Sequence, residues 1–452
     1  MLASKEVQIN KILLGDSRQL LKQLPDSRYS LLFTSPPYAL SIREYTKDDP
    51  DEIGRENSIT EYLDALIQVA NEAKRVLYPW ACQVWNIGDR FKDKRQLKIP
   101  QKFSDRMEEI GYYQFDETIW YKGNGSPTSA PTHFRPDFEK VLFFAREDQD
   151  RYFFDLNATR VPLADVTVKR DEYALGALNP MGNGMNSRHS KEKVKFDIMP
   201  KVGGSKHAGN NSNATYSGNN VKSRDGKANL GSVWEISPQL ERFALEYCPE
   251  CHELRDKDHM WKRCGKCHQY RFENDEQCPI CKKNTNHEMI CTECNKNIHS
   301  HYAQFPLELA RRVVKSCSPE YVCSQCGTPR MPTYNITRID TRPGNDTNNG
   351  RGGSVSDPNG GLHSSEWSKK RQTSIAESTG FESQCSCNAA FEAGVVLDPF
   401  MGWGTTAVVC LENGRNFLGC DINRYNIEAA IKRLEWVDKE KNIPFTNQSR
   451  LF

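Results

Sequence analysis

Residues 395–406, VVLDPFMGWGTT, decide the fold class of this chain. The stretch begins as a short apolar run that ends in Asp398, turns through two glycines, and continues with apolar side chains at helical spacing. A second apolar run, residues 416–420, ends in Asp421, where α/β nucleotide-binding units carry an acidic residue for the ribose hydroxyl groups. The pattern therefore predicts an α/β fold with a pocket for the adenosine part of a cofactor.

The same turn differs from a dinucleotide-binding loop. The segment Gly402-Trp403-Gly404 leads into two threonines instead of a third glycine, and no basic side chain awaits a pyrophosphate. Taken alone, the segment also fits a plain tight turn between a strand and a helix. A second motif is therefore needed before the pocket can be assigned.

That second motif is SLLFTSPPY, residues 30–38. The composition of residues 30–34 predicts a strand, and the turn follows at its carboxyl end, where open parallel sheets place their binding sites. The two prolines fix the backbone, so the carbonyl groups of Ser35 and Pro36 can be held out as hydrogen-bond acceptors. Two acceptors on a nucleobase amine would favour the pyramidal form that attacks an electrophilic methyl group, and Tyr38 would stack on the base. The alternative is a Pro-Pro turn that only closes a strand.

Together, TSPPY at 34–38 and DPFMGWGTT at 398–406 resemble the motifs of the β-class amino-methyltransferases of DNA. The catalytic motif precedes the cofactor motif, which is the circularly permuted order of that family. The chain is most similar to the N4-cytosine-specific enzymes, because a serine in the first motif usually accompanies cytosine. Four further segments resemble the family: ILLGD at 12–16, IGDR at 87–90, FEKVLFF at 138–144 and HYAQFPL at 301–307.

The resemblance implies S-adenosyl-L-methionine as cofactor and double-stranded DNA as substrate, with the target base turned out of the helix before methyl transfer. The catalytic residues it implies hold the amine and stack on the base; they are Ser35, Pro36, Pro37 and Tyr38. The implied cofactor residues include one near the adenine (Asp16) and one near the methionine end (Phe305); the full set is Asp16, Phe305, Asp398, Phe400, Gly402, Gly404, Thr405 and Asp421. Base flipping and restriction-modification follow from the same resemblance, with a cognate restriction endonuclease as a further expected partner.

Three alternatives stay open at the level of sequence. An N6-adenine DNA methyltransferase would share every motif, and an enzyme that methylates structured RNA would use the same chemistry. A zinc-rich DNA-binding protein without catalytic activity is the third. The presence of both motifs favours an enzyme, and the serine in the first favours a site-specific DNA methyltransferase of the cytosine-N4 type.

The whole chain has 452 residues, 37% of them hydrophobic, and a formal net charge of +2. This length predicts two or three units rather than one. The N-terminus lacks the basic and apolar blocks of a secretion signal, and no run predicts a membrane span. We therefore expect a cytoplasmic protein, encoded by a prokaryote or a phage, with no membrane partner.

Between the two motifs, the composition becomes polar and basic. Residues 169–231 hold eleven Lys or Arg against five Asp or Glu, and are rich in Asn, Gly and Ser. Lysines spread along such a tract would contact DNA phosphates and make binding sensitive to salt. In the permuted order, target recognition falls here, so residues 151–232 are the candidate target recognition region. A solvated surface insertion would have the same composition.

Cysteine pairs supply a second strong signal, because the chain carries sixteen cysteines and most of them are paired along the sequence. In a chain that keeps its thiols reduced, CxxC pairs predict zinc sites rather than disulfides. The segment 233–300 holds enough thiolates for two structural zinc ions, from Cys248, Cys251, Cys264, Cys267, Cys278, Cys281, Cys291 and Cys294. Sequential pairing of the four knuckles and an interleaved arrangement both remain open.

A third zinc site is predicted from Cys323, Cys326, Cys385 and Cys387. These four cysteines enclose a Gly-, Ser- and Asn-rich excursion, residues 321–389, between two parts of the cofactor half. A metal that joined the two pairs would bring the ends of the excursion together. The prediction is three structural Zn2+ ions in total.

The expected architecture is an α/β, doubly wound methyltransferase sheet, circularly permuted, with inserted zinc-ribbon modules. Its catalytic half is residues 1–150, and its cofactor half is residues 301–320 and 390–440. The patterns predict strands near 10–14, 30–34, 81–87, 114–121, 139–144, 395–398 and 416–420. They predict helices near 17–24, 59–77, 101–110, 307–316, 405–413 and 424–437. The resemblance adds that the sheet has seven strands, one of them antiparallel.

Overall fold

The computed structural model describes several separate stretches of the chain. In the short strands between 161 and 291 other than residues 233–235, and in parts of the strands within 334–340 and 372–378, only the backbone is described. The described residues are 7–40, 52–123, 133–134, 136–159, 161–162, 191–194, 227–228, 230–237, 246–248, 253–255, 260–264, 287–291, 305–340 and 372–445.

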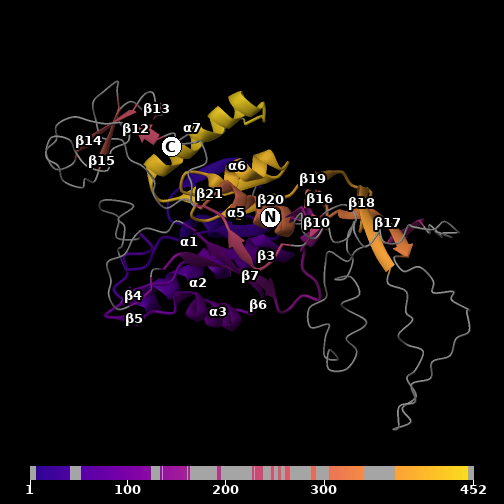
Figure 1. Ribbon diagram of the computed structural model, residues 1–452, viewed down its shortest axis with the longest axis horizontal. Helices are drawn as coiled ribbons and strands as arrows, with labels where there is room; N and C mark the ends of the chain where they lie inside the picture. Colours follow the sequence, from indigo (N-terminus) through magenta and orange to yellow (C-terminus); the bar gives the residue numbers. More distant parts are fainter. Residues whose placement is uncertain are drawn as a thin grey trace, which may run out of the picture.

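An eight-stranded sheet runs through the centre of the molecule (Figure 1). In spatial order its strands are β1 (Lys11–Leu14), β21 (Asn416–Asp421), β20 (Val395–Asp398), β2 (Tyr29–Thr34), β3 (Leu77–Ile87), β7 (Phe138–Arg146), β6 (Tyr112–Tyr121) and β11 (Val233–Glu235). Strand β7 is antiparallel to both of its neighbours, and every other pairing is parallel. The mixed α/β sheet and its single antiparallel strand agree with the expectation from sequence.

The expectation of seven strands was wrong by one strand within the described part of the chain. The extra strand, β11, has three residues and pairs with β6. It is held by its tertiary surroundings: the Trp234 ring lies against Phe143, and the Trp120 indole donates to the carbonyl oxygen of Ile236 at 2.8 Å. A three-residue strand is too short to show periodicity, so sequence patterns could not find it.

In the described part of the chain, six α-helices cover the two faces of the sheet, as a doubly wound fold requires. On one face lie α5 (Leu307–Cys317), α6 (Thr405–Glu412) and α7 (Arg424–Lys441). On the other lie α1 (Ser17–Leu20), α2 (Ile59–Val76) and α3 (Ile99–Glu109), with the 3-10 turn η1 (Leu21–Gln23) after α1. Side chains of alternate residues in the central strands pack into two hydrophobic cores, one on each face of the sheet. These helices therefore lie where the sequence predicted them.

The order of the strands creates a topological switch point between β20 and β2. Strand β20 leads through α6 to β21 on one side, whereas β2 leads through α2 to β3 on the other side. Because the two connections leave in opposite directions, a crevice opens beyond the carboxyl ends of these strands. Both strands are buried along their whole length. The two sequence motifs begin at this crevice.

Smaller elements belong to the insertions. Strand β16 (Tyr321–Cys323) pairs with β19 (Phe391–Ala393), and the hairpin β17 (Met331–Asp340) and β18 (Gln372–Glu382) lies between them in sequence. Strand β9 (Lys191–Val194), from the basic insertion, adds to β17. The remaining short strands are β4 (Phe91–Lys92) with β5 (Arg95–Gln96), β8 (Val161–Pro162) with β10 (Lys227–Ala228), β12 (Glu246–Cys248) with β13 (Glu253–Arg255), and β14 (Met260–Cys264) with β15 (His287–Cys291).

In Figure 1, strands β12 to β15 lie beside α7, and the β17–β18 hairpin extends from the opposite end of the molecule. The basic insertion is thus joined by backbone pairing to the excursion that the cysteines enclose. Among the described helices, none has the length and the apolar composition needed to cross a membrane.

Candidate active site

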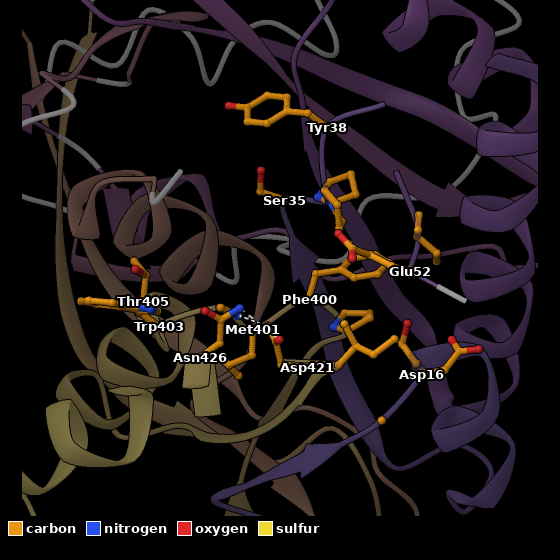
Figure 2. A pocket seen from close by; sticks show the side chains of 18 of the residues that line it. Asp16, Ser35, Tyr38, Glu52, Phe400, Met401, Trp403, Thr405, Asp421 and Asn426 are labelled. Atoms are coloured by element: carbon orange, nitrogen blue, oxygen red, sulfur yellow. Dashed lines mark hydrogen bonds between the residues drawn. The ribbon is translucent and has the colours of Figure 1, made fainter. Parts of the chain in front are cut away.

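The two sequence motifs line one pocket of about 850 Å³ (Figure 2). The turn 35–38 enters from the end of β2, and the turn 399–405 enters from the end of the adjacent strand β20. A buried hydrogen bond joins the last residues of the two strands from which the turns start: Thr34 Oγ1 donates to Asp398 Oδ1 at 2.6 Å. Residues 364 positions apart in the sequence are therefore brought together at the switch point.

The glycine-rich turn is held by its own acidic residue. Asp398 is buried and accepts hydrogen bonds from the Thr406 hydroxyl at 2.5 Å and from the Phe400 backbone N–H at 3.1 Å, in addition to that from Thr34. Burial raises the pKa of Asp398 to about 6, although these three donors act to lower it. Both glycines of the turn have positive φ, 53° at Gly402 and 77° at Gly404, a conformation in which side chains are strained.

Asp421, at the end of β21, closes the other side of the turn. Its Oδ2 accepts the Gly402 backbone N–H at 2.8 Å, and its Oδ1 accepts the backbone N–H of Asn423 at 2.8 Å and the Asn426 side-chain amide at 3.1 Å. Burial raises the pKa of Asp421 to about 6. Figure 2 shows Asp421, Asn426 and Met401 together on the side of the pocket away from Tyr38.

The turn of residues 35–38, here called the proline turn, is held by hydrogen bonds to residues outside it. The Tyr62 hydroxyl donates to the carbonyl oxygen of Pro37 at 2.8 Å, and the Arg90 guanidinium donates to that of Ala39 at 2.6 Å. The Tyr38 hydroxyl donates to Glu139 at 2.9 Å, and the Asn86 amide donates to Ser35 Oγ at 3.3 Å. Four residues distant in the sequence thus fix the backbone and side chains of this turn.

A second pocket, of about 350 Å³, adjoins the first. Three residues line both pockets: Ser35, Pro36 and Tyr38. The second pocket is otherwise lined by residues from α2, β3, the start of α3 and the loops between them, including Asn86 and Arg90. The Asn86 Oδ1 atom is buried and has no hydrogen-bond partner among the described residues. The turn 35–38 therefore stands between a large pocket and a smaller one.

Of the predicted catalytic and cofactor residues, ten line the first pocket: Ser35, Pro36, Pro37, Tyr38, Asp16, Phe305, Phe400, Gly402, Thr405 and Asp421. Phe305 also packs edge-to-face on Phe33, with ring centroids 5.0 Å apart. Asp16 caps the first turn of α1 and pairs with Arg18. Asp398 and Gly404 do not line the pocket; they shape the turn from behind, where Gly404 packs against Ala430.

Sequence reasoning missed several residues that line the first pocket. Trp403 stands inside the quoted motif and Asn426 follows Asp421 by five positions, so their place in the sequence was a usable signal. Glu52 and Ile53 had no such signal, because nothing in the sequence ties them to either motif. Glu52 is buried and pairs with Arg55 at 2.9 Å.

The composition of the first pocket fits S-adenosyl-L-methionine. Asp16, Glu52 and Asp421 are carboxylates that would favour a cofactor with positive charge and ribose hydroxyl groups. Phe305, Phe400 and Trp403 supply the apolar surface that small-molecule pockets use to bury rings and chains.

The four cysteines of the predicted third zinc site lie together in the structure. The sulfur atoms of Cys323, Cys326, Cys385 and Cys387 all lie within 4.8 Å of one another. The carbonyl oxygen of Gly327, in the loop after the first pair, accepts the Trp80 indole N–H at 3.1 Å, so the cluster docks on β3. A Cβ atom at position 327 would lie 2.0 Å from the Tyr78 ring, so only glycine fits this contact. The four thiols suit a tetrahedral zinc ion.

The eight other predicted zinc ligands are less completely described. Cys248, Cys264 and Cys291 lie in short strands of which only the backbone is described, and Cys251, Cys267, Cys278, Cys281 and Cys294 lie outside the described residues. The backbone register of β14 and β15 places Cys264 opposite His287 and Cys291 opposite Met260, at opposite ends of the ribbon. Most of the basic insertion, residues 163–190 and 195–226, is also outside the described residues.

Comparison with known sequences gives one family match. A sequence model of the family described as DNA methylase, which comprises N6 and N4 methyltransferases, matches residues 29–323 and 385–432. The type II methyltransferase M.MwoI of Methanothermobacter wolfeii is 33% identical over 157 residues, covering 34% of this chain and 23% of M.MwoI. The type II methyltransferase M.SfiI of Streptomyces fimbriatus is 28% identical over 165 residues, covering 33% of this chain and 38% of M.SfiI. The chain thus spans less than two fifths of the length of either relative.

Two solved structures can be set beside it. The cytosine-N4-specific PvuII DNA methyltransferase has a TM-score of 0.43 at 13% identity, over 94% of this chain and 86% of that chain. The DNA modification methylase TTHA0409 of Thermus thermophilus, complexed with S-adenosyl-L-methionine, has a TM-score of 0.41 at 15% identity, over 96% and 95% of the two chains. Because the family match covers more than half of the sequence, this chain belongs to the DNA methylase family of N6 and N4 amino-methyltransferases.

Proposed function

We propose that this protein transfers a methyl group from S-adenosyl-L-methionine to the exocyclic N4 amine of cytosine in a specific sequence of double-stranded DNA. The observation that supports this proposal most directly is the meeting of two pockets at Ser35, Pro36 and Tyr38. A donor and an acceptor of a methyl group must approach each other on one line, and two adjoining pockets provide the two sides of that line.

The residues of the first pocket bind and orient the cofactor, which supplies an electrophilic methyl group when bound. Asp421 would hold the ribose hydroxyl groups, with its orientation fixed by the hydrogen bonds from Gly402 and Asn423. Asp16 would lie near the adenine and Phe305 near the methionine end of the cofactor. Asp398 and Gly404 keep the turn in shape from behind the pocket.

The residues of the second pocket hold the base. The target base must leave the helical stack, because its amine is otherwise paired and shielded. Ser35 Oγ and the carbonyl oxygen of Pro36 accept the two N–H groups of the amine, and Tyr38 stacks on the ring. The Asn86 Oδ1 atom, a buried acceptor without a partner among the described residues, is a further group that a base amine would satisfy.

The choice of base rests on Ser35, because serine at this position usually accompanies cytosine N4. An N6-adenine DNA methyltransferase is the alternative, since both bases present an exocyclic amine to the same acceptors. A structured RNA is the less favoured substrate. The basic tract within residues 151–232 supports a nucleic acid as substrate, because lysines spread along a chain match phosphates along a backbone.

Mass spectrometry of nucleosides tests the proposal. Unmethylated genomic DNA and, in a parallel reaction, structured RNA would be incubated with the purified protein and S-adenosyl-L-methionine, digested to nucleosides and analysed. The expected product is N4-methyldeoxycytidine. If N6-methyldeoxyadenosine appeared instead, the proposed target base would be wrong, but methyl transfer to an exocyclic amine would still be the reaction. Methylation of structured RNA alone, or of neither substrate, would overturn the proposal.

The same proposal includes the partners and metals of the protein. Cys323, Cys326, Cys385 and Cys387 hold one structural zinc, and the knuckles of residues 248–294 hold two more. The enzyme acts in the cytoplasm of a prokaryote or a phage-infected cell, as part of a restriction-modification pair with a cognate endonuclease.

A further inference from the structure

A buried carboxylate beside the second pocket has no place in the methyl-transfer scheme above. Glu139 is the second residue of β7, and it is only 4% exposed. Three donors converge on it: Tyr38 Oη at 2.9 Å, Asn86 Nδ2 at 2.6 Å and Lys122 Nζ at 2.5 Å. Two of these three donors belong to residues that line the second pocket.

The first contact fixes the ring of Tyr38. Its hydroxyl is anchored on Glu139 Oε1, and one edge of the ring packs close to the backbone at Gly88, directly after β3. A Cβ atom at position 88 would lie 3.4 Å from both Tyr38 Cε1 and Glu139 Cγ, so the backbone at Gly88 lies directly beside both residues. In Figure 2 the Tyr38 ring lies apart from Asp421, and its hydroxyl does not point toward that residue. Because Glu139 does not line the first pocket, the ring is anchored by a residue outside the predicted cofactor site.

The second contact fixes the orientation of Asn86. A carboxylate only accepts hydrogen bonds, so the Asn86 amide must present its NH2 group to Glu139. That NH2 group also donates to Ser35 Oγ at 3.3 Å. Because a hydroxyl has two acceptor lone pairs, Ser35 keeps one for an incoming amine. The orientation that Glu139 imposes on Asn86 is thus passed on to Ser35.

The third contact makes the buried charge tolerable. Lys122, at the end of the neighbouring strand β6, compensates the negative charge of Glu139 and lies over the Trp120 ring, 4.9 Å from its centroid. A carboxylate without such a partner would be costly at this burial. A single acid on β7 therefore connects β6, β3 and the proline turn.

We propose that Glu139 is a positioning residue for methyl transfer: it holds the Tyr38 ring and, through Asn86, the Ser35 hydroxyl in their working geometry before the base arrives. The inference rests on the proposed reaction at this site. Preorganised contacts of this kind raise the rate because misplacement of a reacting group is costly even when binding is intact. The competing interpretation is an ion pair with Lys122 that stabilises the sheet and does nothing else.

A double-mutant cycle between Glu139→Gln and Tyr38→Phe separates the two interpretations. Glutamine has the shape of glutamate but only one acceptor oxygen, so it cannot receive all three donors. Single-turnover methyl transfer would be measured with radiolabelled S-adenosyl-L-methionine and fragments of unmethylated genomic DNA. Each single variant should be slower by roughly tenfold, the expected loss for a hydrogen bond to a charged group. The double variant should be no slower than the slower single variant, to within about twofold.

Two controls accompany the cycle. Glu117→Gln changes the same type of residue on β6, where the acid pairs with Lys140 at 2.8 Å away from both pockets, and should leave the rate unchanged. Binding of S-adenosyl-L-methionine, measured by calorimetry, should change by less than about twofold in every variant. If Glu139→Gln does not fold, Tyr38→Phe alone carries the test, because it leaves the buried acid in place.

The outcomes are distinguishable. Rates of Glu139→Gln or Tyr38→Phe equal to that of the wild type would overturn the inference, as would losses that multiply in the double variant. Absence of methyl transfer by the wild-type protein would instead overturn the proposed function and leave these contacts without a reaction to serve.

Discussion

The two turns of the candidate site are built in different ways. The glycine-rich turn takes most of its hydrogen-bond partners from residues 398–426. The proline turn takes its partners from Tyr62, Asn86, Arg90 and Glu139, which belong to helices, strands and loops elsewhere in the domain. One turn is largely stabilised by its own sequence neighbourhood, whereas the other depends on the surrounding fold.

This difference suggests a division of labour. A turn that carries most of its own partners can hold a cofactor of fixed shape, because its geometry depends less on distant strands, the contact of Asp398 with Thr34 being the exception. A turn anchored by distant residues is sensitive to changes throughout the domain, and can be oriented by them. Substitutions in the two turns should therefore separate methyl transfer from cofactor binding.

The largest effect is expected from Tyr38→Ala. Loss of the aromatic ring removes stacking on the base, which is worth about 1–3 kcal/mol, and removes the hydrogen bond that anchors the proline turn to Glu139. We therefore expect a roughly 100-fold slower single-turnover rate. The Kd of S-adenosyl-L-methionine should change little, because the glycine turn is untouched. Calorimetry and a radiolabel assay on the same preparation measure both quantities. A comparable loss of binding and rate would contradict the separation of the two turns.

The next effect is expected from Asp421→Asn, on cofactor binding rather than on base positioning. In the proposed complex the variant loses a negative charge that would face the cationic cofactor. It also places an NH2 group beside the backbone N–H groups whose hydrogen bonds Asp421 now accepts, so we expect a roughly tenfold higher Kd. The rate at saturating cofactor should fall less than the affinity. A matched variant, Asp148→Asn, changes an exposed acid that pairs with Arg146 and should leave the Kd unchanged.

The same residue predicts a pH dependence. Because the pKa of Asp421 is raised to about 6, it is ionised above that pH and protonated below it, so cofactor affinity should fall as the pH drops from 7 to 5. Asp421→Asn should flatten this part of the profile. The free energy of unfolding changes with pH in the opposite direction. The native state keeps a proton on Asp421 that the unfolded chain releases near pH 3.8, so the contribution of Asp421 to stability decreases as the pH rises from there toward 6.

The smallest effect on either turn is expected from Cys387→Ser. The cysteine cluster docks on Tyr78 and Trp80, near the start of β3, and its residues line neither pocket. We expect one zinc ion fewer per chain and a lower Tm, with the rate of the folded protein unchanged within about twofold. Cys410→Ser alters a buried thiol outside the cluster and should keep the zinc content. An unchanged zinc content in Cys387→Ser would rule out this cluster as a zinc site.

Much of the fold could be predicted because its signals are local. The seven predicted strands and six predicted helices coincide with elements of the structure, since long apolar strands and amphipathic helices carry their own periodicity. The resemblance to the amino-methyltransferases of DNA is confirmed by the family match. The short strand β11 and the hairpin β17–β18 were not predicted, because the first is too short and the second lies in a segment of low hydrophobicity.

The sequence alone determined the chemistry on offer: a rigid turn with a hydroxyl and an aromatic ring, a glycine turn between a strand and a helix, and four cysteines in two close pairs. These depend on residue type and short spacing, so they can be read without coordinates. The tertiary structure alone decided which groups meet. Thr34 reaches Asp398 because β2 and β20 are adjacent parallel strands, and Tyr38 reaches Glu139 because β7 folds back beside β3. Contacts over more than a hundred residues follow from strand order, which no local pattern encodes.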